Sequence, residues 1–79
     1  MTEISDARKF GRQDAKDYLL KKRPKTIRAM SAVQQFFRNH IDKKFGAHSN
    51  TWKREYGDGV MEILYEYHKN GYTLKKKEG

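Results

Sequence analysis

The sequence predicts an all-α fold, a compact bundle of three helices in residues 1–74, followed by a disordered lysine-rich tail at residues 75–79. Two observations predict the bundle. In two long segments, apolar residues recur every three or four positions, which is the spacing of a buried helical stripe. The single proline, Pro24, ends an earlier helical pattern, because the residue before a proline disfavours helix. At 79 residues the chain forms one domain, and its 13% aromatic content supplies large side chains for a small core.

The first helix is expected to run from about residue 5 or 6 to Lys22, with Ser5 as its N-cap. One face of its helical wheel carries Ala7, Phe10, Gly11, Ala15 and Tyr18. A glycine inside a helix costs about 1 kcal/mol relative to alanine. Gly11 therefore indicates a close contact with a second helix.

The second helix is expected to begin after Thr26, which can cap it, and to end at Gly46 in a left-handed conformation. Its apolar stripe consists of Met30, Val33, Phe37, Ile41 and Phe45, and it is widened by Ile27, Phe36 and His40. A stripe of this width predicts that the second helix lies at the centre, between the other two.

The third helix is expected to begin near residues 49–51 and to end at Asn70-Gly71. Its stripe consists of Trp52, Tyr56, Val60, Ile63, Leu64 and Tyr67. Gly57 and Gly59 indicate either close backbone packing or a kink at Asp58. Asn70-Gly71 is also a hairpin signal for residues 60–74, but a helix is favoured because Tyr72 can then pack back on Tyr67.

Positive charge is concentrated in the first half of the chain. Residues 1–44 hold 12 basic and 5 acidic residues, whereas residues 45–79 hold 6 and 5. Its densest part, which we call the basic block, consists of Lys21, Lys22, Arg23, Lys25 and Arg28. Like charges repel, so a cluster of this kind favours a polyanionic partner, of which nucleic acid is the commonest. The expected phosphate contacts are Arg8, Arg12, Lys16, Lys21, Lys22, Arg23 and Lys25.

The polar side of the second helix carries Arg28, Gln35, Arg38 and Asn39. Arginine, glutamine and asparagine make paired hydrogen bonds to base edges, so this side is a candidate for reading DNA. A basic turn before such a helix resembles the layout of a helix-turn-helix unit, although the segment from Lys21 to Thr26 is long for that turn. An ordinary solvated helix face is the alternative.

One edge of the third helix is acidic and carries Glu55, Asp58, Glu62 and Glu66. This edge argues against entry of the third helix into a DNA groove. It is expected to be solvated, with pairing to basic residues of the first helix as the alternative.

No catalytic, metal or cofactor site is expected. The chain has no cysteine, its three histidines lack the spacing of a zinc motif, and no phosphate-binding glycine loop is present. No apolar run resembles a signal peptide or a membrane span, so a cytoplasmic protein is expected.

The sequence therefore favours a non-catalytic nucleic-acid-binding protein, a small regulator whose preferred partner is duplex DNA. The alternative is a small basic inhibitor or adaptor, of the phage or mobile-element type, that binds a host protein, for example at a nucleic-acid-binding site. A three-helix core is not expected to hold Phe36, Tyr65 and Tyr72 together, and the alternative is that they extend a small core. If exposed, they could stack on unpaired bases or anchor a protein interface.

Overall fold

The computed structural model describes residues 3–74 and confirms a compact all-α bundle of three helices, with no strand in that range. The helices are α1 (Glu3–Lys22), α2 (Ile27–Lys44) and α3 (Asn50–Lys69). The tail expected at residues 75–79 lies outside the described residues. None of the three helices is long and apolar enough to cross a membrane.

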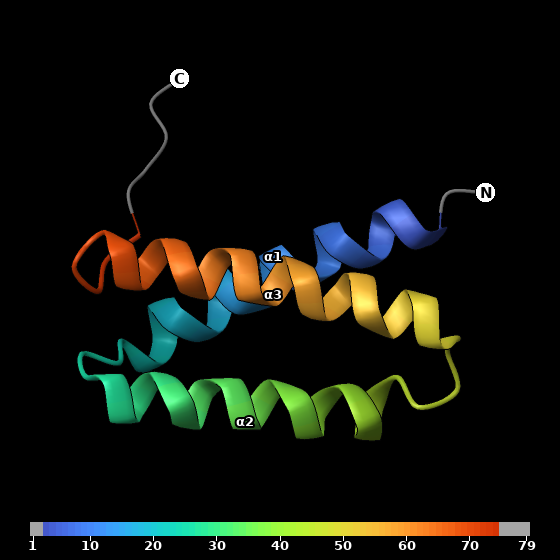
Figure 1. Ribbon diagram of the computed structural model, residues 1–79, viewed down its shortest axis with the longest axis horizontal. Coiled ribbons are helices and arrows are strands. Elements are labelled where there is room, and N and C mark those ends of the chain that lie inside the picture. Colours follow the sequence, from blue (N-terminus) through green and yellow to red (C-terminus); the bar gives the residue numbers. More distant parts are fainter. Residues whose placement is uncertain (1–2, 75–79) are drawn as a thin grey trace.

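The central helix is α3, not α2 as the width of the α2 stripe predicted. Figure 1 shows α2 and α3 side by side, with α1 crossing α3. No Cα atom of α1 lies within 8 Å of a Cα atom of α2, whereas both helices approach α3. Two residues that widened the predicted stripe are in fact largely outside the core, because Ile27 is 66% exposed and Phe36 is 40% exposed.

The closest approach in the bundle is between α1 and α3, and it depends on two glycines. A Cβ atom at Gly11 would overlap the carbonyl oxygen of Tyr56, and one at Gly59 would overlap the carbonyl oxygen of Arg8. Ala7 and Ala15 are fully buried on the same face of α1. The predicted helix–helix contact at Gly11 is confirmed, and α3 is continuous through its glycines without the alternative break at Asp58.

The predicted inner face of α1 is partly wrong. Phe10 is 53% exposed, whereas Leu19, which the wheel did not include, is fully buried. The helix also begins at Glu3, so Ser5 lies inside it and is not its N-cap. The small residues of this face let α1 sit close to α3, which leaves no room for the ring of Phe10 between the two backbones.

The other helix ends follow local chemistry. The Thr26 and Ser49 hydroxyls accept hydrogen bonds from the Ala29 and Trp52 amides, at 3.0 and 3.1 Å. After α3, Gly71 takes a φ of 79°, and the Tyr72 ring packs against Tyr67, as predicted for a helical ending.

The end of α2 differs from the expectation. The C-cap is Phe45, and Gly46 is not among the residues with positive φ. A Cβ atom at Gly46 would lie 2.7 Å from the carbonyl oxygen of Asp42. The glycine is therefore needed for space and not for a left-handed turn.

Two buried tyrosines make long-range hydrogen bonds that hold the bundle together. The Tyr56 hydroxyl donates to Asp14 Oδ2 at 2.5 Å, and the Tyr67 hydroxyl donates to the Pro24 carbonyl at 2.8 Å. Burial raises the pKa of Tyr56 above its ordinary value, and the nearby carboxylate of Asp14 raises it further. Burial also raises the pKa of Tyr67, partly offset by the positive charge of Arg23.

These shifts predict a loss of stability in alkali. Both phenols have a higher pKa in the folded than in the unfolded chain, so their contribution is complete below about pH 10 and is lost as the pH rises above it. We expect the free energy of unfolding, measured in urea, to fall by up to about 1.4 kcal/mol per pH unit for each tyrosine. Tyr56→Phe should flatten this decline, and an equally steep decline in that variant would contradict the assignment.

Candidate nucleic-acid interface

The turn between α1 and α2 is fixed by hydrogen bonds to α1 and to α3. Arg23 leaves the helix with a φ of 47°, while its amide still donates to the Leu19 carbonyl at 2.8 Å. Pro24 follows, is buried, and carries the carbonyl bonded by Tyr67 of α3. The sequence Arg-Pro therefore stops α1 and anchors the turn to the central helix.

The basic block lies around this anchored turn, and all five of its residues are exposed. Among the side chains that the structure describes, every ion pair involves either Arg8 or Arg12. Among these described side chains, no carboxylate pairs with the basic block, which consists of Lys21, Lys22, Arg23, Lys25 and Arg28. A segment with five positive charges and no ion-paired carboxylate among the described side chains presents a positive potential to solvent.

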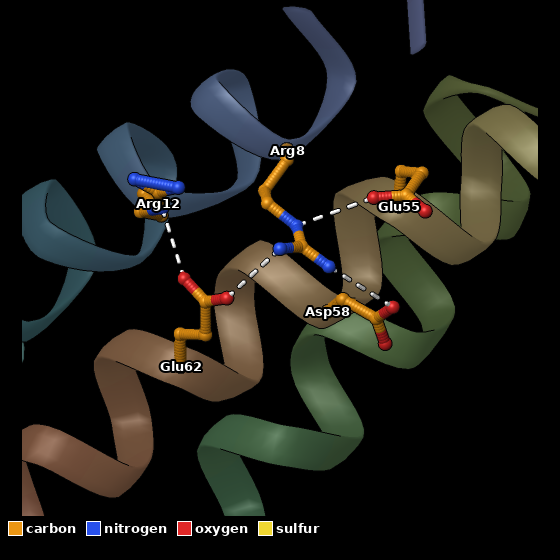
Figure 2. Close-up of polar contacts among 5 residues, drawn as sticks. All are labelled: Arg8, Arg12, Glu55, Asp58 and Glu62. Atoms are coloured by element: carbon orange, nitrogen blue, oxygen red, sulfur yellow. Dashed lines mark ion pairs between the residues drawn. The ribbon is translucent and has the colours of Figure 1, made fainter. Parts of the chain in front are cut away.

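By contrast, Arg8 and Arg12 are neutralised within the fold (Figure 2). The Arg8 guanidinium lies 3.2 Å from Glu55, 3.3 Å from Glu62 and 3.7 Å from Asp58. Arg12 Nε lies 3.0 Å from the other oxygen of Glu62. The contact of Arg8 Nε with Glu55 lacks the direction of a hydrogen bond, so it is electrostatic. Three carboxylates thus face two guanidiniums.

The acidic edge of α3 is therefore not simply solvated, because three of its four members pair with α1. Each guanidinium nitrogen of Arg8 faces a carboxylate, so a phosphate would have to compete with like charge there. Arg12 is paired through its Nε alone, and its side chain is 44% exposed. The fold separates these two arginines from the basic block, with which the sequence had grouped them. Lys16, one turn after Arg12, is exposed and lies outside these ion pairs.

The outer face of α2 points away from α3. Met30, Val33 and Phe37 are buried on the inner side of the helix, and all four predicted base-reading residues are exposed: Arg28, Gln35, Arg38 and Asn39. Arg28 belongs to the first turn of α2, so the basic block continues directly onto this face. Asp42 is the one acidic residue of α2.

Two hollows of about 240 Å³ each flank α2. One lies between α1 and α2 and contains Tyr18, Phe36 and His40. The other lies between α2 and α3, where Ile27, Met61 and Tyr65 leave large apolar surfaces exposed. Of the three aromatics expected to exceed the core, Phe36 and Tyr65 are exposed, and Tyr72 is half-buried against Tyr67 and His68.

In the described part of the chain, no three His, Asp or Glu side chains are arranged to hold a metal ion. No family model, curated protein or solved structure matches the chain.

Proposed function

We propose that this protein is a non-catalytic nucleic-acid-binding protein that contacts phosphates through the basic block. The observation that carries the proposal is the contrast between two groups of basic residues. Arg8 and Arg12 are compensated by three carboxylates, whereas the basic block faces solvent without such partners. A polyanion would relieve the repulsion within the block and gain affinity by releasing its own counterions.

The preferred partner is duplex DNA, with the outer face of α2 next to the bases. Its arginines, Gln35 and Asn39 have the side chains that pair with base edges, and α2 is the least covered helix of the bundle. The arrangement is helix-turn-helix-like in order, since a basic turn precedes the exposed helix. It differs from that unit in packing, because α2 rests on α3 and not on α1.

Replacing four residues of the block tests the phosphate contacts. Changing Lys21, Lys22, Arg23 and Lys25 to alanine should weaken duplex binding and flatten its salt dependence by about 0.9 log units per lost contact. Fluorescence anisotropy across a salt series measures both quantities. The matched control removes the same charge elsewhere, from Lys9, Lys53, Arg54 and Lys69. If both variants lose affinity equally, the block is not the contact surface, and if the parent binds no duplex at low salt, the proposal is wrong.

A separate test addresses sequence reading by α2. Gln35→Ala or Asn39→Ala should reduce discrimination between a preferred and a scrambled site by roughly 1–3 kcal/mol per lost base contact. The salt slope should stay as in the parent, because neither residue is charged. Selection from random duplexes supplies the preferred site. If no site is enriched, α2 does not read sequence and the protein binds through charge alone.

A second candidate function is binding to a host protein as an inhibitor or adaptor. The hollow between α2 and α3 favours it, because Ile27 and Tyr65 are two-thirds exposed and Met61 is nearly half exposed. Ile27→Asp with Tyr65→Asp should abolish capture of such a partner from nuclease-treated lysate, while duplex binding persists. Loss of duplex binding alone would assign this face to the nucleic-acid interface.

A further inference from the structure

The hollow between α1 and α2 has a floor of aromatic rings. The Tyr18 and Phe36 rings are stacked, with centroids 4.5 Å apart and planes 17° apart. The His40 ring continues the stack at 5.5 Å from Phe36, again within 17°. Phe36 is 40% exposed and already stacks with both Tyr18 and His40. A further ring would therefore extend the column on Tyr18 or His40, which are half-buried. Nearly parallel rings of this kind suit a further planar ring.

The rim of the same hollow carries both signs of charge. Lys21 and Lys44 supply ammonium groups, and Asp14 and Asp17 supply carboxylates. Asp14 Oδ2 accepts from the Tyr56 hydroxyl, and Asp17 Oδ1 accepts from Gln13 Nε2. The second oxygen of each carboxylate accepts no hydrogen bond from the side chains that the structure describes, so each can accept one from a ligand.

A ligand that matches the stacked rings, the carboxylates and the ammonium groups of this hollow has a flat ring, an N–H donor at its edge and a negative charge beside it. A nucleotide has these parts: its base can stack, an exocyclic amine can donate, and its phosphate can pair with lysine. The volume of about 240 Å³ is smaller than the 300–1,000 Å³ that drug-sized ligands occupy, and so is suited to a single base.

We propose that this hollow binds one unpaired nucleotide of the nucleic acid held by the basic block. Lys21 belongs to both surfaces, so a strand that leaves the block passes directly over the hollow. The base extends the aromatic column, Lys21 and Lys44 contact the flanking phosphates, and Asp17 accepts from a base amine. The domain therefore binds duplexes with single-stranded ends more tightly than blunt ones. This inference rests on the proposed nucleic-acid binding.

Labelled duplexes that differ only in a short single-stranded overhang test the inference by fluorescence anisotropy. We expect the overhang to tighten binding by at least about 5-fold, the lower end of what one base–aromatic stack contributes. Phe36→Leu should remove this gain and leave blunt-duplex binding unchanged. The matched control, Phe10→Leu, replaces another exposed ring of the first two helices and should keep the gain. Circular dichroism verifies that both variants are folded.

The identity of the overhanging base gives a second readout, which depends on the exposed residue Asp17. Cytosine offers Asp17 an exocyclic amine with two N–H donors, whereas thymine offers only the N–H of its ring, so a dC overhang should bind more tightly than a dT overhang. Asp17→Ala should abolish this difference, and Asp42→Ala, which removes the same charge from the outer face of α2, should retain it.

The outcomes separate the two proposals. No binding to any duplex at low salt overturns the proposed function. Blunt-duplex binding with no gain from an overhang, or a gain that survives Phe36→Leu, overturns the unpaired-nucleotide site and leaves the proposed function standing.

Discussion

Gly59→Ala is expected to destabilise the fold by about 2–3 kcal/mol, although alanine is the better helix former. The added Cβ atom would overlap the Arg8 carbonyl oxygen and would lie 3.1 Å from the Arg12 amide nitrogen. Both are backbone atoms of α1 and cannot rotate away. The two helices must therefore move apart, which also lengthens the ion pairs between α1 and the acidic edge of α3. Urea unfolding at neutral pH measures the change.

Gly57→Ala is the matched control for this substitution. It lies two residues away in the same helix, but a Cβ atom there would be 3.8 Å from Ile41 Cδ1, which is ordinary contact. We expect a gain of up to about 1 kcal/mol from helix propensity alone. If Gly59→Ala were also stabilising, the close α1–α3 contact would be contradicted.

Phe37→Ala is expected to cost about 3–5 kcal/mol. Phe37 is 3% exposed, and its ring lies edge-on to Tyr18 and His40, so truncation leaves a cavity beneath the α1–α2 hollow. A domain of this size has a stability of roughly 4–12 kcal/mol, at about 0.05–0.15 kcal/mol per residue. The variant should consequently unfold at markedly lower temperature and lower urea concentration.

Phe10→Ala removes the same side chain from an exposed position. Because Phe10 is 53% exposed, we expect a loss below about 1 kcal/mol. Thermal unfolding followed at the helical circular-dichroism signal compares the two variants. Equal losses of stability in the two variants would contradict the placement of Phe37 in the core.

The features predicted correctly from the sequence are local ones. A cap depends on one side chain and an amide three residues away, so Thr26 could be identified without tertiary information. The cap of α3, Ser49, falls in the range of residues 49–51 where that helix was expected to begin. The Asn70-Gly71 ending likewise needs only a residue that tolerates positive φ and an aromatic to pack back. The stripes of α2 and α3 follow from spacing alone.

The order of the helices in space could not be read in this way. An apolar stripe shows which face of a helix is buried but not which helix covers it, so α2 was wrongly placed at the centre. Small residues, and not the large apolar ones, determine which two helices pack most closely. Gly11 packs against the backbone of Tyr56 and Gly59 against that of Arg8, which are 45 and 51 positions away in the chain, so nothing local links them.

The pairing of charges could not be predicted for the same reason. Arg8, Arg12 and the basic block look equivalent along the sequence, and their difference comes from three carboxylates of α3. The stacked rings of Tyr18, Phe36 and His40 were also not predicted as a unit, because they come from two helices. Phe36 was expected either to widen the buried stripe of the second helix or to lie outside the core, and it is 40% exposed.

The pairing of α1 with α3, rather than with its neighbour α2, has a consequence for how the chain assembles. The bond from Tyr67 to Pro24 spans 43 residues, so most of the chain must be closed into a loop before α1 finds its partner. Three-helix proteins in which helices adjacent in sequence pack together have low contact order and fold quickly. Here α1 packs on α3, so the contact order is higher and folding is expected to be slower. On the ribosome, α1 and α2 emerge first without the surface that both require. Docking of α3 is then the step that commits the chain, and the turn bearing the basic block takes its final position only when nearly the whole domain has been made.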